Sequence, residues 1–361
     1  MTFSAILGLV AFNLVVFGVG ATSLYAMRGL RSWNESIRLA GLAYMLGVAV
    51  TGVVFVFELV VGLSLSFGAI LATVAVLTVA AIAVGIRLDR PRPRGSVTLG
   101  RISLPARCSG LHSSSTPRRS SGQHGWQAYM SSTAGGCGCR RGLAIYFFGG
   151  LDHQFFSKLP GPSYPPVVPA YEAGAFHFMH SPDVVTVHLQ FWFFLVGFAT
   201  AVVGLLSRRV QAMFLWPPLL LLLVAPNVLN RGLQAGGDFS LDEMLALAAL
   251  LIALWLDDQA SWRLAGATVF LAAAMSVKRE GYLLAACIAL AALLVSWRQR
   301  RTAWPRLALC AAVAFGLTIP WRLLLLGPRP SGRRAGSGRD GLVLPCGSRV
   351  AVTAPGVVNL V

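Results

Sequence analysis

The side chains in this sequence that could do chemistry stand in three polar segments, each beside a long apolar run. A carboxylate can act as a general base toward a hydroxyl group, and a cation can hold an anionic group. The candidate site residues in these segments are Asp152, His153, Tyr164, Asp238, Lys278 and Glu280.

Each of these residues also has a structural interpretation. Asp152 could cap a loop turn, and Asp238 could favour a helix N-terminus or bind an acceptor or a divalent ion. Lys278 stands at the end of a short apolar run, where a cation is costly and is often functional. The structural alternative is that its side chain extends to the membrane interface. Glu280 could pair with Lys278 or with Arg279 and hold it in place.

Three histidines near Asp183 suggest a test for a metal site. His177 and His180 are three residues apart, so one helical face could hold both, and His188 follows. No acidic second shell is evident, so no metal ligand and no cofactor are predicted, and a divalent ion is left as an alternative.

Glu58 is a carboxylate inside an apolar run, which makes it a functional candidate. A protonated carboxyl, or one paired with a hydroxyl such as that of Ser64, is the structural alternative.

The elements that must position these residues are apolar helices. Hydrophobic residues make up 56% of the 361 residues and charged residues 12%, against about a quarter charged in soluble domains. A helix needs ~20 apolar residues to cross a bilayer. We therefore predict an all-α, polytopic transmembrane helical bundle of about eight to ten spans, from segments 3–26, 39–62, 66–86, 187–206, 212–229, 241–256, 263–277, 281–297 and 306–326.

The net charge of +17 comes from arginines that fall between the apolar runs. Such placement sets membrane topology, with arginine-rich connections in the cytoplasm. It forms no basic face with interleaved aromatics, so the lipid bilayer and not nucleic acid is the expected partner. We expect a multi-pass protein of the cell membrane with the three polar segments outside.

Composition divides the chain into five parts. The arginines place residues 87–94 inside and those before 187 outside, which requires a crossing where the best candidate, 142–151, has about half the needed length. The parts are N-terminal transmembrane helices (1–95), an irregular segment (96–141), an outer loop with a Tyr-Pro-Pro motif (142–186), a transmembrane helical core (187–326) and an irregular tail (327–361).

The two irregular parts have two interpretations. Their excess of Ser, Arg, Gly and Pro is typical of a disordered linker. It is also typical of GC-rich DNA translated out of frame, and the bias for arginine over lysine throughout the chain indicates a GC-rich bacterium.

Three short motifs carry a resemblance to a known family. They are Tyr164-Pro165-Pro166, Gly237-Asp238-Phe239 and the run from Ser276 to Gly281. In order and outer placement they resemble segments of the GT-C class of membrane glycosyltransferases, in the group with protein O-mannosyltransferases, aminoarabinose transferases and bacterial Rgt-type enzymes. The resemblance covers about 145 to 325.

The resemblance implies transfer of a sugar from a polyprenyl-phosphate donor to an acceptor outside the cytoplasm. It also implies a catalytic Asp or Glu upstream of Tyr164, where Asp152 is the nearest carboxylate of this chain, and cationic groups that stabilise the leaving phosphate. The other five candidates, His153, Tyr164, Asp238, Lys278 and Glu280, would then bind the substrate. This chain departs from the pattern, because residues 130–138 stand where related bacterial enzymes carry Glu-aromatic-Asp-Gly-Trp-x-x-Trp. Codons read one nucleotide earlier can spell that motif, and this frameshift hypothesis implies that the present copy lacks its main catalytic acid and is inactive.

Two other classes of function remain open. A secondary transporter should show internal repeats and broken helices around a midplane site, and the sequence shows no such repeat. A non-catalytic membrane protein is supported only by the scarcity of polar groups within the spans.

Overall fold

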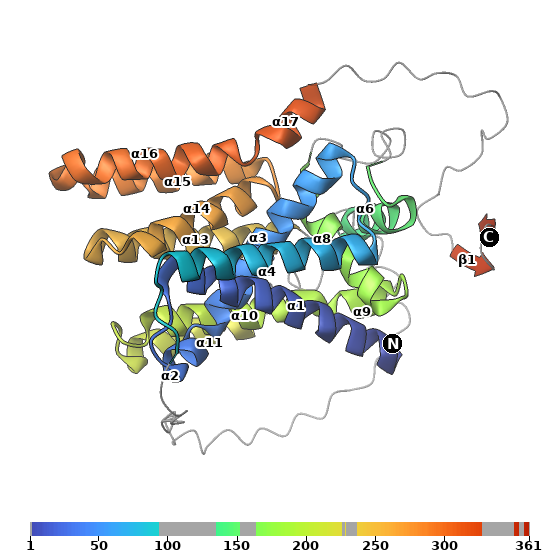
Figure 1. Ribbon diagram of the computed structural model, residues 1–361, viewed down its shortest axis with the longest axis horizontal. Helices are drawn as coiled ribbons and strands as arrows, with labels where there is room; N and C mark the ends of the chain where they lie inside the picture. Colours follow the sequence, from blue (N-terminus) through green and yellow to red (C-terminus); the bar gives the residue numbers. More distant parts are fainter. Residues whose placement is uncertain are drawn as a thin grey trace.

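Apolar helices lie side by side along one direction in the computed structural model of the protein (Figure 1). The structure describes residues 2–93, 135–151, 164–225, 228, 237–326, 350–353 and 357–360. The helices of the bundle are α1 (Phe3–Arg28), α2 (Trp33–Arg38), α3 (Ala40–Val61), α4 (Phe67–Arg87), α6 (Gly135–Phe148), α8 (Val167–Met179), α9 (Val184–Val187), α10 (Leu189–Leu206), α11 (Ala212–Val224), α13 (Gly237–Asp258), α14 (Ser261–Met275), α15 (Glu280–Val295), η1 (Trp297–Gln299), α16 (Arg300–Gly316) and α17 (Ile319–Leu326).

Small polar residues start the first helices where the sequence turns apolar. The hydroxyl of Thr2 accepts a hydrogen bond from the amide of Ala5 at the start of α1, and Ser66 does the same for Ala69 at the start of α4. These contacts satisfy amide groups that the first helical turn leaves free. Both helices end at an arginine. The length of the apolar run and the polar residues at its two ends therefore define the segments that can cross a bilayer.

Five of the described helices are long and apolar enough to span a membrane: α1, α3, α4, the continuous segment from α9 through α10, and α13. Helices α15 and α16, bent by 73° at the break between them, would make a sixth if the pair counts as one span. This confirms the predicted all-α polytopic membrane bundle.

The described residues contain fewer long spans than the eight to ten expected. Four of the predicted segments form helices of only 13 to 17 residues, namely α11, α14, α15 and α16. At ~1.5 Å per residue such helices reach roughly 20 to 26 Å, which is less than the ~30 Å of a bilayer core. Hydropathy located these segments correctly but did not set their lengths.

A seam of glycines joins α1 to α3. A Cβ atom on Gly20 would come within 1.7 Å of the carbonyl oxygen of Ala43, and one on Gly47 within 2.1 Å of that of Val16. Gly18, on the same helix α1, has no atom within 4 Å of the equivalent position. Small residues let membrane helices approach closely and pack by van der Waals contact, so this seam sets the distance between the two helices.

A buried polar network ties α1 and α3 to α10. The side-chain amide of Asn13 donates to Gln190 Oε1 at 2.8 Å, and Gln190 Nε2 donates back to Asn13 Oδ1 at 2.8 Å. The hydroxyl of Tyr44 donates to the same Asn13 oxygen at 2.6 Å. Three polar side chains are thereby satisfied inside an apolar bundle, where an unpaired group would be costly.

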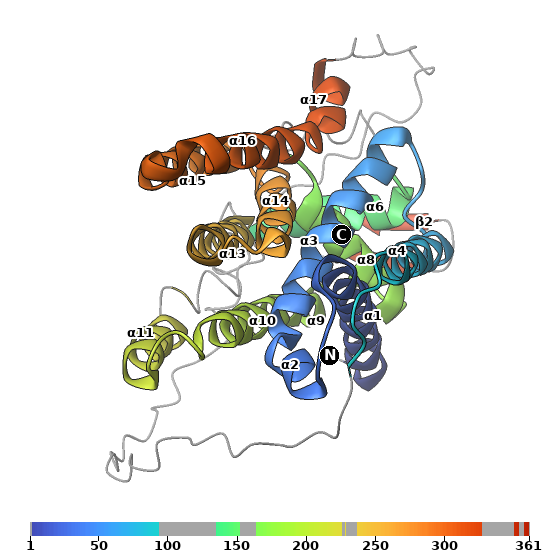
Figure 2. The same cartoon turned by 60° about the vertical axis from the view of Figure 1, so that its left-hand side comes forward.

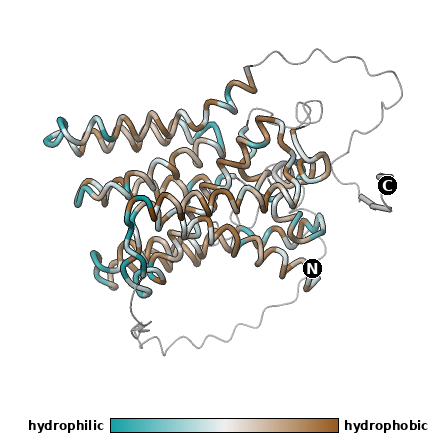
Figure 3. Tube along the Cα trace, viewed as in Figure 1, coloured by the Kyte–Doolittle hydropathy of each residue, from teal (hydrophilic) through white to brown (hydrophobic). Residues whose placement is uncertain are grey.

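The bundle has two chemically distinct ends. Hydrophilic residues gather where the helices end, and the lengths between are hydrophobic (Figure 3). At one end, Leu30 bonds to Pro91 and Arg38 to the carbonyl of Gly204, so the arginine-rich connections meet there. We call this the inner end, following the positive-inside rule. Its arginines are Arg28, Arg31, Arg38, Arg87, Arg90, Arg208, Arg209, Arg263, Arg298, Arg300 and Arg301.

Helix pairs build the rest of the bundle in tiers. Figures 1 and 2 agree that the α13–α14 pair lies between α10 and the α15–α16 pair. Tyr282 at the start of α15 packs edge-to-face against Phe315 at the end of α16, with ring centres 6.2 Å apart. These two helices therefore run antiparallel, and the α14–α15 connection lies at the end opposite the arginines, the outer end.

The segment expected to be irregular, 96–141, is partly helical. Helix α6 begins at Gly135 and carries Cys139 and Arg141 in buried positions. The backbone amide of Leu65, in the outer connection between α3 and α4, donates to Gly149 after α6. Pro93 follows the inner end, so the chain changes side between Pro93 and Gly149. Residues 94–134 lie outside the described part.

In the tail expected to be irregular, two strands pair antiparallel, β1 (Val350–Thr353) with β2 (Val357–Leu360).

Candidate functional site

Four of the six candidate residues come together at the outer end of the bundle. Tyr164 precedes α8, Asp238 stands in the first turn of α13, Lys278 lies in the connection from α14 to α15, and Glu280 is the first residue of α15. We call these four residues the outer cluster. Three segments that are far apart in the sequence thus lie together at one end of the bundle.

Direct contacts link all four members of the outer cluster. The ammonium group of Lys278 forms an ion pair with Asp238 Oδ1. The same Nζ lies 5.8 Å from the centre of the Tyr164 ring, within cation–π range. The Tyr164 hydroxyl donates to Glu280 Oε1 at 3.3 Å. A cation therefore lies between an anion and an aromatic face, and a second carboxylate positions that aromatic ring.

Close backbone approaches position the charged groups. A Cβ on Gly281 would meet the carbonyl oxygen of Ala274 at 2.5 Å, so the connection that carries Lys278 is tightly folded. A Cβ on Gly237 would lie 3.4 Å from the Lys278 side chain, which brings the start of α13 beside the cation. The Lys278 side chain is 24% exposed and that of Asp238 55%, so solvent reaches the carboxylate more readily than the cation.

The observed partner of Glu280 differs from the predicted one. Glu280 was expected to pair with Lys278 or Arg279, but Lys278 pairs with Asp238 and Glu280 accepts the Tyr164 hydroxyl. The short connection places Asp238 of the neighbouring helix α13 beside the cation. Asp152 and His153 lie outside the described residues, and their roles stay predictions.

Sequence reasoning missed a buried group next to the cluster. Arg141 Nη1 donates to the backbone carbonyl of Tyr164 at 3.4 Å, and the residue is 5% exposed. On the same helix, the Cys139 thiol lies 3.8 Å from Glu172 Oε1 of α8, a residue that is also buried. Both contacts depend on α6, and the glycine-rich, arginine-rich composition around Gly135 gave no periodic signal for that helix.

Beneath the outer cluster lies a small internal cavity of about 10 Å³ between α3, α8, α10, α13 and α14. Its walls are mostly apolar. They include Val167, which follows Tyr164 by three residues, and Val277, which precedes Lys278 in the sequence. Ser240 Oγ is buried at this cavity without a hydrogen-bond partner in the described part of the chain. A volume of this size holds about one water molecule, so this cavity is too small to hold a sugar.

The histidines considered as metal ligands are engaged in separate contacts. His177 stacks on Tyr146 at 4.7 Å between ring centres, and His180 stacks on Phe67 at 5.7 Å. Asp183 caps α9 through the amides of Val185 and Thr186. Burial raises the pKa of Asp183, but its hydrogen bonds with Thr186 outweigh this and hold the pKa below the ordinary value. Among the described residues no group of three His, Cys, Asp or Glu side chains is arranged to hold a metal ion.

Glu58 pairs with a hydroxyl, but not with that of Ser64. Its Oε1 accepts a hydrogen bond from Thr73, which stands on the neighbouring helix α4. The contact joins α3 to α4 near the lipid-facing side, because α4 is the least buried of the long helices. This favours the structural interpretation of Glu58.

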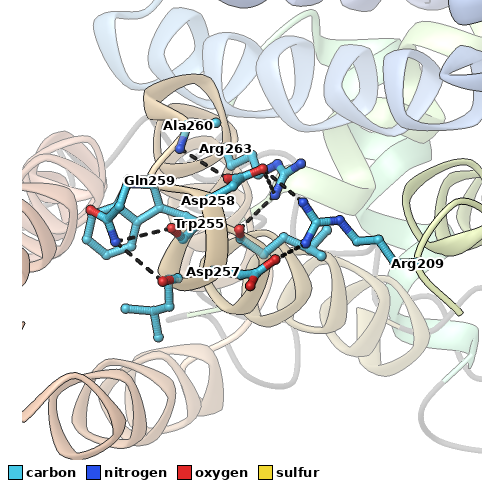
Figure 4. A network of polar contacts seen from close by, with 9 residues as sticks. Arg209, Trp255, Asp257, Asp258, Gln259, Ala260 and Arg263 are labelled. Atoms are coloured by element: carbon cyan, nitrogen blue, oxygen red, sulfur yellow. Dashed lines mark hydrogen bonds and ion pairs between the residues drawn. The ribbon is translucent and has the colours of Figure 1, made fainter.

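A second polar cluster closes the inner end (Figure 4). Arg209, after α10, pairs with Asp257 and with Asp258 at the end of α13, the latter at 2.9 Å. Asp258 also pairs with Arg263 of α14 at 2.6 Å, and its other oxygen accepts the amide of Ala260 at 3.1 Å. These contacts join three helices where the chain turns, so their role is structural.

Arginine stacking extends that inner cluster to α1. The guanidinium of Arg28 lies 4.9 Å from the centre of the Trp262 ring, and that of Arg263 lies 5.3 Å from it. Arg28 also pairs with Glu35 at 2.5 Å. Burial alone would raise the pKa of the Glu35 carboxyl group. The hydrogen bond from the Arg31 amide and the charge of Arg28 lower this pKa by more than burial raises it, so the net shift is downward.

The fold defines a multi-pass helical membrane protein with a charged and aromatic cluster at its outer end. No protein-family model, no curated protein and no solved structure matches this chain. The function must therefore be argued from the outer cluster itself.

Proposed function

We propose that the protein is a membrane glycosyltransferase that moves a sugar from a polyprenyl-phosphate donor to an acceptor outside the cytoplasm. The observation that carries this proposal is the convergence of Tyr164, Asp238, Lys278 and Glu280 on one outer site. We place it in the cell membrane of a GC-rich bacterium.

The chemistry of the cluster suits a phosphate-linked sugar. Lys278 offers a positive charge to a phosphate, and the Tyr164 ring offers a flat face of the kind that apolar sugar faces contact. Asp238 and Glu280 offer acceptors for sugar hydroxyls or for a proton. The cluster therefore contains a cation for the leaving phosphate and carboxylates for the acceptor.

The lipid part of such a donor has a matching surface. Helix α15 begins two residues after Lys278 and exposes leucines at helical spacing along its length, including Leu283, Leu290 and Leu294. Residues spaced by four and seven share one face of a helix. A polyprenyl chain whose phosphate contacts Lys278 could follow this face into the bilayer.

Sugar transfer can be measured directly. Proteoliposomes with the protein would receive radiolabelled polyprenyl-phosphate sugars, with Lys278→Met as the control that removes the cation. A second arm uses the gene with its frame restored across residues 96–141. Transfer in either arm, lost on Lys278→Met, is the expected result. No transfer in both arms contradicts the proposal, and transfer only in the restored arm shows that the present copy is inactive.

A second candidate, a proton-coupled secondary transporter, is favoured by one observation. Glu243 is buried on α13, and both of its carboxylate oxygens lack a hydrogen-bond partner among the described residues. A buried carboxylate within a span is a common proton site in transporters. Solute uptake driven by a pH gradient in proteoliposomes, abolished by Glu243→Gln, would favour this class. Absence of both transfer and uptake would leave a non-catalytic membrane protein.

A further inference from the structure

The carboxylates near the outer end differ in their burial and in their hydrogen-bond or ion-pair partners. Glu280 accepts the Tyr164 hydroxyl, and Asp183 caps α9. Glu172 and Glu243 are buried within the bundle. Asp238 is half exposed at the start of α13, and its carboxylate pairs with Lys278. Among these five described carboxylates, Asp238 is therefore the one that an exchange of partners on Lys278 would free.

We propose that Asp238 is the general base of this chain, released when the donor phosphate takes its place on Lys278. The inference rests on the proposed glycosyltransferase function and assigns its proton acceptor. It applies to the chain as written, which does not carry the expected acidic motif upstream of Tyr164.

The contacts around Lys278 favour exchange at the carboxylate. The Tyr164 ring lies on the cation, and the tight turn at Gly281 holds the connection. Asp238 is the more exposed partner. An incoming phosphodiester carries one negative charge, as Asp238 does, so the charge next to Lys278 is balanced before and after the exchange. Asp238 remains in the first turn of α13, where the helix dipole favours a negative charge without its cation.

The transfer step balances with these groups. The acceptor hydroxyl gives its proton to the Asp238 carboxylate while its oxygen forms a bond to the anomeric carbon of the sugar. The bond between that carbon and the phosphate oxygen breaks, and its electron pair stays on the oxygen. The products are the glycoside, protonated Asp238 and a polyprenyl phosphate dianion beside Lys278. The total charge of the reacting groups is −2 before and after the step.

The test compares Asp238→Asn with Asp242→Asn, because Asp242 stands one turn later on α13 and is also exposed. The chain as written is placed in nanodiscs, and two quantities are measured: kcat for sugar transfer, and Kd for polyprenyl phosphate without sugar. General acid–base groups contribute about 10²- to 10⁴-fold to rate, so Asp238→Asn should lower kcat by at least about 100-fold. Its Kd should fall by up to about fivefold, because an exposed ion pair of up to about 1 kcal/mol no longer competes.

The control and the rescue variant make the outcome decisive. Asp242→Asn should leave kcat and Kd within about twofold of the original protein, and Asp238→Glu should recover part of kcat because it restores a carboxylate. The inference is wrong if Asp238→Asn keeps its kcat. It is also wrong if the chain as written transfers no sugar while the frame-restored chain does, although the proposed function then stands. Absence of transfer in both chains overturns the proposed function as well.

Discussion

The ammonium nitrogen of Lys278 lies 5.8 Å from the centre of the Tyr164 ring, while the hydroxyl of the same ring donates to Glu280. The ring and the hydroxyl of Tyr164 thus contact groups of opposite charge. Substitutions that remove one function at a time can separate the two contacts.

Tyr164→Leu should weaken polyprenyl-phosphate binding more than Tyr164→Phe does. An exposed cation–π contact is worth ~0.5 to 1 kcal/mol, so loss of the ring should raise Kd roughly two- to fivefold. Phenylalanine keeps the ring and loses only the hydrogen bond to Glu280. Titration in nanodiscs measures both, and equal effects of the two substitutions would contradict a role for the ring.

Gly20→Ala should destabilise the protein, whereas Gly18→Ala should not. The new methyl group at Gly20 meets the backbone of Ala43, while that at Gly18 meets nothing within 4 Å. Overpacking costs ~1 to 3 kcal/mol, which corresponds to a loss of roughly 2 to 10 °C in the melting temperature. Thermal unfolding in detergent measures both variants, and equal melting temperatures would show that α1 and α3 can separate freely.

Asn13→Leu and Gln190→Leu should each lower the free energy of unfolding by more than half of what the double substitution does, because either one alone already breaks the contact between the two amides. Asn13→Leu leaves Gln190 with the Tyr44 hydroxyl but without its acceptor and donor on α1. Hydrogen bonds between membrane helices contribute ~0.6 to 1.7 kcal/mol. A double-mutant cycle with Gln190→Leu should give a coupling energy in that range, and purely additive effects would argue against a direct pair.

Asp258→Asn should destabilise the inner end more than Asp257→Asn. Asp258 pairs with two arginines, one of which, Arg263, is only 12% exposed. The Asp257 side chain is 67% exposed, and within the described part of the chain it pairs with Arg209 only. Exposed pairs are worth at most about 1 kcal/mol, and an uncompensated buried charge costs more. Unfolding at low and high salt measures this, and the Asp257 effect should vanish at high salt.

The Glu35 carboxylate should make stability depend on pH in the acidic range. Its pKa is lower in the folded protein than its ordinary value of 4.5, so folding favours the ionised form. The stabilisation is present above pH 4.5 and is lost as the pH falls through the folded pKa. The difference in melting temperature between the original protein and Glu35→Gln should therefore be constant from neutral pH to about pH 5.5 and shrink below about pH 4.5. A difference that grows on acidification would contradict this.

The long helices could be predicted from the sequence because apolar length is a local property. The segments 3–26, 39–62 and 66–86 match α1, α3 and α4 to within two residues at each end. The number of spans could not be predicted in the same way. Whether a helix of 13 to 17 residues crosses, bends or re-enters depends on its neighbours, as the break between α15 and α16 shows.

The outer cluster was predictable in its members but not in its pairing. Motif order and arginine placement put Tyr164, Asp238 and Lys278 on one side of the bundle. Which carboxylate reaches Lys278 depends on the lateral packing of α13 against the α14–α15 connection, for which the sequence has no local signal. Arg141 was missed for a related reason, since α6 begins in a glycine-rich and arginine-rich stretch and only its second half, from Leu143 to Phe148, is apolar.

The polar network around Asn13 also bears on how the protein is made. Gln190 stands 177 residues after Asn13, whereas Tyr44 stands only 31 residues after it. During synthesis α1 enters the bilayer long before α10 exists, and an amide left alone in hydrocarbon is costly. Within α1 the Asn13 amide nitrogen already donates to the carbonyl of Leu9. The hairpin of α1 and α3 adds the Tyr44 hydroxyl, which donates to Asn13 Oδ1, and the Gly20–Gly47 seam brings the helices close enough for this contact. The two remaining hydrogen bonds of Asn13, both to the Gln190 side chain, can form only when α10 packs against α1 in the correct register.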